Sequence, residues 1–239
     1  MRFTRLFLRG LKDAYDQFVL LMIVSVLWWA CAILIVPGPP ATVALFRMMD
    51  PRNAIQMPEI SDFFRILREH FKTAWAVALF TVPIIVVLSW NMLFFQDSDS
   101  VFAIMVPLWF VMIVITFMLM LYAFATVAAM ESYTRNAFRG AVYLMVMRPF
   151  TTGVLFVLLS VLLGLFTVLV LPLILFGPGA VAAVVNRFVL SGYDVEVIDP
   201  SAPTQERAHE VARGINPDRS GIKGFFQRSR DNRNREARR

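Results

Sequence analysis

The stretch VPGPPATVALFRMM, residues 36–49, follows an apolar run long enough to cross a bilayer and then continues as a second, shorter apolar run. Proline breaks a helix, and glycine permits unusual backbone dihedrals. Pro37, Gly38, Pro39 and Pro40 therefore predict a turn between two helical limbs. The limb that ends at Arg47 amounts to about 12 Å of helix at 1.5 Å per residue, so it is too short to cross a bilayer alone.

Charged residues are distributed very unevenly along the chain. The 239 residues are 58% hydrophobic and only 17% charged, whereas soluble domains are about 25% charged. None of the charged residues falls within four windows, each longer than the roughly 20 residues that a spanning helix needs: 17–46, 73–96, 100–130 and 149–186. We therefore expect an all-α, polytopic helical membrane protein.

The charges between these windows predict its topology. Cytoplasmic flanks of spans are rich in Lys and Arg, and every connection here is basic except QDSDS at 96–100. Four single crossings would put the basic 47–72 connection outside. Two full spans, through 73–96 and 100–130, satisfy all the flanks if the first and last windows are Pro/Gly-broken helical hairpins. This arrangement places both termini in the cytoplasm.

The last window resembles the first in its layout. Gly177, Pro178 and Gly179 interrupt a long apolar run and predict the turn of the second hairpin. A shift of 140 residues places Arg187 on Arg47. This correspondence indicates either an internal repeat, as in many transport proteins, or a chance similarity of two apolar hairpins.

Basic, aromatic-rich stretches such as ISDFFRILREHFKTAW precede three of the windows. They predict amphipathic helices that either lie in the membrane interface or dock a cytoplasmic partner. We divide the chain into a transmembrane helical domain, 1–192, and a basic cytoplasmic tail, 193–239, which we expect to be disordered when free. In the tail, Lys223, Phe225, Phe226 and Arg228 are predicted to contact an anionic membrane surface.

The segments PATVALFRMM, FFRILREHFKTAW, NAFRGAVYLMVMRPFTTGVLFVLL and LFGPGAVAAVVNRF occur in an order and spacing that resemble the YesL-like family. That family consists of bacterial integral membrane proteins without an established activity. The resemblance covers roughly residues 10 to 192. It implies a location in the bacterial cytoplasmic (inner) membrane and an accessory role in carbohydrate uptake, and it supplies no catalytic residues.

Two sets of residues are candidates for binding or packing. Basic residues at the window ends could hold an anion or a lipid headgroup, because arginine binds phosphate in a bidentate way; these are Arg47, Arg187, Arg68, Lys72 and Arg148. The alternative is that they snorkel to the cytoplasmic surface. Ser160 and Gly164 form a small-x-x-x-small pair, which is typical of helix packing in membranes.

No catalytic constellation, metal site or cofactor motif is visible in the sequence, and we expect no enzyme. One cysteine excludes an internal disulfide. We expect the lipid bilayer and another membrane protein, or further copies of the chain, as partners, and no nucleic acid. The leading function is a non-enzymatic accessory protein of a membrane complex, in carbohydrate or solute uptake. The alternatives are a small oligomeric transporter or channel, which a water-filled cavity would favour, and a structural subunit or assembly factor, which a solid core would favour.

Overall fold

The computed structural model describes residues 7–11, 15, 17–53, 59–96, 104–130, 134–168 and 170–193. All regular secondary structure in these residues is helical, which confirms the predicted all-α fold. The elements are α2 (Phe18–Ile33), α3 (Gly38–Met48), the 3₁₀ turn η1 (Pro51–Asn53), α4 (Ile60–Glu69), α5 (Phe71–Phe95), α6 (Val106–Met130), α7 (Thr134–Met147), α8 (Pro149–Val168) and α9 (Val170–Gly192). Residues 194–239 of the predicted tail, including Lys223, Phe225, Phe226 and Arg228, lie outside the described residues.

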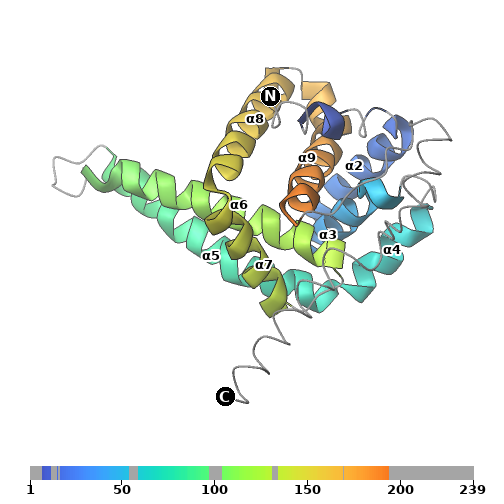
Figure 1. Cartoon of the computed structure of the whole chain (residues 1–239), viewed down its shortest axis with the longest axis horizontal. Helices are drawn as coiled ribbons and strands as arrows, with labels where there is room; N and C mark the ends of the chain where they lie inside the picture. Colours follow the sequence, from blue (N-terminus) through green and yellow to red (C-terminus); the bar gives the residue numbers. More distant parts are fainter. Residues whose placement is uncertain are drawn as a thin grey trace, which may run out of the picture.

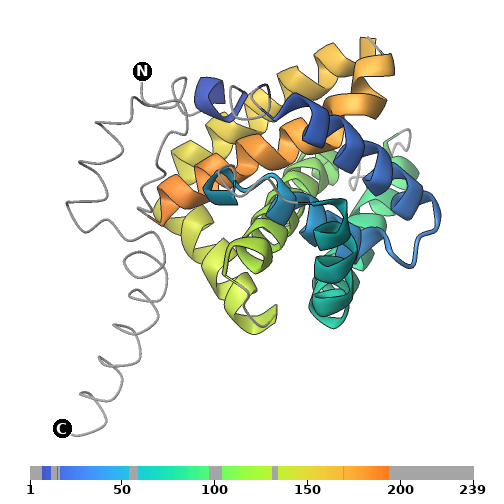
Figure 2. The same cartoon turned by 90° about the vertical axis from the view of Figure 1, so that its right-hand side faces the viewer.

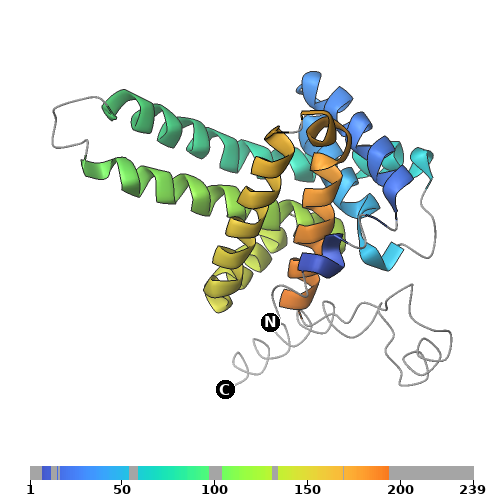
Figure 3. The same cartoon turned by 90° about the horizontal axis from the view of Figure 1, so that it is seen from above.

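Among the described residues, four helices are long and apolar enough to cross a membrane: Phe71–Phe95, Val106–Met130, Pro149–Val168 and Ile174–Gly192. Together with the helical content they confirm a polytopic membrane protein. α5 and α6 run side by side and project from the rest of the molecule, and the α8–α9 pair crosses them (Figures 1 and 3). Figure 2 shows α8, α9 and α2 as an upper layer over α4, α5, α6 and α7.

The short helix α3 lies at the centre of the core. It contacts α2, α4, α5, α6 and α9, and its residues Ala41, Val43 and Ala44 have no exposed surface. Small side chains let neighbouring membrane helices approach closely. A short limb is thus shielded by protein on many sides, which is the condition under which a helix end is tolerated at membrane depth.

The chain turns between α2 and α3, at the amino-terminal edge of the first predicted hairpin turn, and of the four predicted turn residues only Pro37 lies in this connection. α2 ends at Ile33, and α3 begins at Gly38 with Pro39 and Pro40 in its first turn. Proline suits this position because the first N–H groups of a helix have no intrahelical partner. The turn is fastened to the next helix by Trp75, whose Nε1 donates to the Val36 carbonyl at 2.9 Å.

The second predicted turn is wrong. Gly177, Pro178 and Gly179 lie inside α9, and the chain reverses earlier, because α8 ends at Val168 and α9 begins at Val170. The Gly179 N–H donates to Ser25 Oγ at 3.1 Å, and a Cβ added at Gly179 would lie 2.7 Å from Leu21 Cγ. The glycine therefore serves close packing of α2 on α9, and the Ser25 hydroxyl of α2 accepts from a backbone N–H next to the proline inside α9.

The predicted packing pair on α8 does not join α8 to another helix within the part of the chain that the structure describes. Ser160 and Gly164 are both exposed, and a Cβ added at Gly164 would meet no atom within 4 Å. Large apolar side chains on the same helix are also exposed, among them Val161 and Val168. The spacing of the two small residues predicts that they share one side of α8, but it does not show whether that side faces the bundle.

Candidate functional site

The carboxyl ends of α3, α6 and α9 meet at one place in the bundle. The last four carbonyls of a helix have no intrahelical partner, and the helix dipole makes this end partly negative. At each of these three ends, a side chain from elsewhere in the chain donates to such a carbonyl. We call this group the helix-end cluster; it comprises Arg47, Arg52, Arg148 and Asn186 with the carbonyls to which they donate, and Asp50, which pairs with Arg52.

Arg47 connects α3 to α6. Its Nη1 donates to the Ala128 carbonyl at 2.6 Å, across 81 residues of sequence. Arg47 lies in the last turn of α3 and is half-buried. Snorkelling to the surface and anion binding were the two predicted roles, and the structure shows a third, the capping of a neighbouring helix.

Arg52 caps the same helix together with a buried acid. Its Nη2 donates to the Ala129 carbonyl at 3.1 Å, and its Nε lies 3.0 Å from both carboxylate oxygens of Asp50. Asp50 is only 2% exposed. A buried carboxylate is tolerated when it is paired and hydrogen-bonded. The Arg52 guanidinium therefore neutralises the charge of Asp50 and also donates to a carbonyl at the end of α6.

α9 is capped in the same manner. Arg148 Nη1 donates to the Ser191 carbonyl at 3.0 Å. Asn186, one helical turn earlier in α9, donates from Nδ2 to the Phe46 carbonyl at the end of α3 at 2.7 Å. Arg187 follows it and is 7% exposed. Two of the predicted arginines, 47 and 148, therefore cap helix ends here, and Arg187 is buried in α9 next to Asn186 in sequence.

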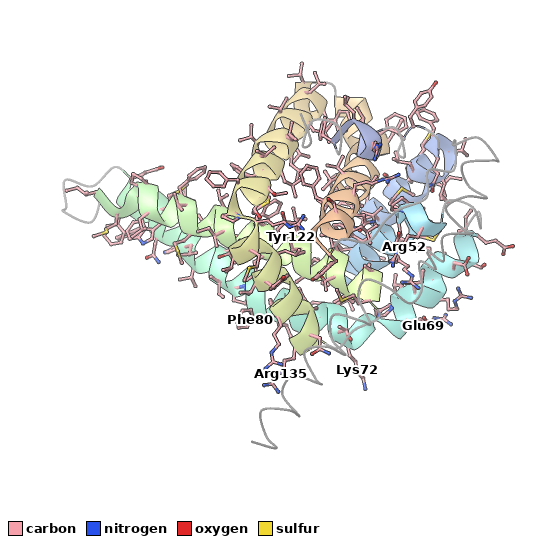
Figure 4. All side chains as sticks on the ribbon, viewed as in Figure 1. Arg52, Glu69, Lys72, Phe80, Tyr122 and Arg135 are labelled. Atoms are coloured by element: carbon pink, nitrogen blue, oxygen red, sulfur yellow. The ribbon has the colours of Figure 1, made fainter. Side chains whose placement is uncertain are left out.

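The other two predicted residues lie elsewhere. Arg68 and Lys72 are exposed at the junction of α4 and α5. In Figure 4, Arg52 lies among the helices, whereas Lys72 and Arg135 lie at the edge of the molecule. The single set predicted from the sequence is thus two sets, one internal and one external.

Two tyrosines border the internal set. Tyr122 OH is hydrogen-bonded to Thr152 Oγ1 at 3.2 Å, and Tyr193 OH to Thr126 Oγ1 at 3.4 Å. Tyr193 follows the last residue of α9. Burial raises the pKa of Tyr193 to about 12, and the hydrogen bond from Thr126 opposes this only in part. Its hydroxyl is neutral at physiological pH.

Asp50, Arg52 and Asn186 were not predicted as part of the site. The Asp-Pro-Arg sequence directly after the α3 limb was a usable signal for the first two, because an acid and a base two residues apart at a helix end can pair. Asn186 had only its polarity at membrane depth as a signal. Chemically, the cluster supplies fixed donors to helix carbonyls, and the described residues contain no group of three His, Cys, Asp or Glu that could hold a metal.

Comparisons with known proteins find one similarity. Residues 21–92 match the family model described as "Protein of unknown function, DUF624". The matched stretch runs from α2 through most of α5 and includes Arg47, Asp50 and Arg52. No curated protein matches the chain. No solved structure matches it. Over less than half of its length, the chain is therefore similar to a family to which no activity is assigned.

Proposed function

We propose that the chain is a non-enzymatic integral membrane protein that is accessory to a partner membrane complex. The basic connections support an orientation with both termini in the cytoplasm. The resemblance to the YesL-like family supports a bacterial cytoplasmic membrane and a setting in carbohydrate or solute uptake. A subunit of this kind acts through contacts with another protein and does not contain a transport path for solute.

The close packing along α9 carries this proposal. A Cβ at Gly179 would approach Leu21 Cγ at 2.7 Å, one at Gly192 would overlap Leu144, and one at Gly10 would lie 3.0 Å from Val184 Cα. Ordinary contacts of a Cβ begin at 3.4 Å. A water-filled path needs room beside its lining helices, and these three sites along α9 leave none. The close packing at these three sites supports an accessory or structural subunit over a transporter or channel with a path along α9.

The outer face of α8 is the surface on which we place the partner. Its exposed side chains include Val157, Val161 and Leu165, each at least 58% exposed. Lipid covers such a face by default, and another membrane helix can replace it. The two exposed small residues, Ser160 and Gly164, lower the steric barrier to such a contact.

Site-specific photocrosslinking in native membranes tests the proposal. A photoreactive residue at Val161 is expected to give one crosslinked membrane protein in stoichiometric yield, and the same residue at buried Val184 only crosslinks within the chain. Lipid adducts alone at Val161, and at the other exposed α8 positions, would contradict an accessory role through this face.

A second measurement addresses the transporter alternative. Cysteines are introduced at Ala44 and Val184 in a background where Cys31, the one cysteine, is replaced by alanine. Both positions have no exposed surface, so a charged, membrane-impermeant thiol reagent should not label them in folded protein. Rapid labelling would indicate a water-filled path and favour the transporter or channel.

A further inference from the structure

Four exposed basic side chains lie on three helices, α4, α5 and α7. Arg68 is in the last turn of α4, and Lys72 is the second residue of α5. Arg135 and Arg139 are exposed one helical turn apart on α7. Figures 1 and 2 place the amino end of α7 and the α4–α5 junction at the same lower edge, and Figure 4 shows Lys72 and Arg135 there. We call these four residues the basic edge.

The basic edge has no acidic partners among the described residues. None of its four members takes part in any recorded ion pair or hydrogen bond with the part of the chain that the structure describes. Arg65 on the same helix behaves differently, since it lies 2.6 Å from Asp62 and 3.9 Å from Glu69. The charge of the basic edge is therefore available to an external anion.

The two halves of the basic edge are held in place relative to each other. α7 packs on α5, where the rings of Phe138 and Phe80 are 4.9 Å apart. α4 runs into α5 with His70 as the only residue between them. The edge is thus carried by packed helices rather than by loose loops.

The depth of the basic edge favours a lipid surface. Lys72 lies in the first turn of the span Phe71–Phe95, and the first turn of a span sits at the level of the headgroups. Exposed apolar side chains flank the charges, with Phe64 46% and Phe71 38% exposed. Helices that combine basic and aromatic side chains in this way lie in the membrane interface. An acidic soluble partner would not require the apolar flank.

We propose that the basic edge binds the phosphate groups of anionic phospholipids in the adjoining leaflet. Arginines 68, 135 and 139 can each present a bidentate fork to a phosphodiester, and Lys72 supplies a point charge. A basic residue near an anionic leaflet contributes a factor of about five in affinity. This surface is separate from the helix-end cluster and does not depend on the proposed accessory function.

Native mass spectrometry of the full chain tests the proposal. The protein is delipidated in mild detergent and titrated with dioleoylphosphatidylglycerol or, in parallel, dioleoylphosphatidylcholine. The wild type is expected to bind the anionic lipid preferentially. The pairs R68Q/K72Q and R135Q/R139Q should each weaken that binding by roughly tenfold or more and leave phosphatidylcholine binding unchanged. The tail is present in every sample, so its contribution cancels.

Two further variants make the result specific. R65Q removes one charge from α4 that is already paired, and it should retain the wild-type affinity. The triple variant R68K/R135K/R139K keeps all charges and should retain most of the preference. Helix content by circular dichroism and a single size-exclusion peak show that each variant is folded. Because all four side chains are exposed, neither pair of substitutions removes a buried contact.

Several outcomes would overturn the proposal. One is equal binding of phosphatidylglycerol by the wild type and both pairs; another is an equal loss of both lipids. Displacement of the lipid by inorganic phosphate would identify a site for a soluble anion instead. A stoichiometric acidic protein that is lost from the paired variants, with lipid binding unchanged, would identify a protein-docking surface.

Discussion

Asn186 donates a hydrogen bond to the Phe46 carbonyl at 2.7 Å, across 140 residues of sequence. The same shift of 140 residues places Arg187 on Arg47, so the two bonded residues occupy positions that correspond under this shift. The hairpins differ in length, however, since α3 has 11 residues and α9 has 23. The hydrogen bond between the two corresponding positions therefore joins a short limb, α3, to a full span, α9.

Replacement of Asn186 by leucine should destabilise the protein by about 1–2 kcal/mol, because the Phe46 carbonyl loses its donor in a buried place. The free energy of unfolding in mixed detergent micelles measures the loss. Thr167→Val is the matched control, since Thr167 is exposed and bonds only to the Leu163 carbonyl of its own helix. An equal loss in both variants would refute a special role for Asn186.

Gly179→Ala should destabilise the α2–α9 contact by about 1–3 kcal/mol, since the new methyl group overlaps Leu21 and Ser25. Gly164→Ala makes the same chemical change on open surface and should be neutral or stabilising by up to about 1 kcal/mol. Thermal unfolding of the two variants in one detergent compares them directly. A Gly179→Ala variant as stable as the wild type would show that α2 and α9 can move apart to admit the methyl group without a loss of stability.

Arg47→Met should lower stability by about 1–2 kcal/mol, because the end of α6 loses both a donor and a favourable charge. Hydrogen exchange should become faster at the carboxyl end of α6 and remain unchanged in the projecting ends of α5 and α6. Arg68→Met is the control, and its exposed position predicts a change within about 0.5 kcal/mol. Unchanged exchange in α6 would exclude the capping role.

Ile35→Gly should stabilise the first hairpin by about 1 kcal/mol. Ile35 has a φ of 60°, a left-handed conformation that is costly for a β-branched residue and free for glycine. Leu34→Gly is matched in exposure but has a φ of −76°, so it should destabilise. The midpoint of thermal unfolding should be higher for Ile35→Gly than for Leu34→Gly. A lower midpoint for Ile35→Gly would refute the strain at Ile35.

Tyr193→Phe should remove part of the alkaline pH dependence of stability. Burial raises the pKa of Tyr193 from 10.0 to about 12. Below pH 10 both states are protonated and the full stability is present; as pH rises from 10 toward 12, only the unfolded chain loses its proton, so stability falls. The variant should show a shallower fall in this window. Because Tyr193 stays protonated in the folded protein, the tyrosinate absorbance of the folded wild type and of the folded variant should be equal up to about pH 11.

The coarse fold was predictable because charge is costly within a bilayer. The four uncharged windows became α2 with α3, α5, α6, and α8 with α9. The turn at Pro37 and Gly38 was predictable too, since local dihedral chemistry decides it. The turn expected at Gly177–Gly179 was not found there, because this segment packs against α2, which is distant in sequence. The same reason hides the role of Arg47, whose partner Ala128 is set by the way the helices meet.

The central position of α3 has a consequence for the order of assembly. The Phe46 carbonyl is made early, and its donor Asn186 is made 140 residues later. At a synthesis rate of about 5–20 residues per second, that interval lasts roughly 7–28 s. During this time, the first hairpin is without its α9 neighbour, and lipid or an insertase must cover its unfinished side.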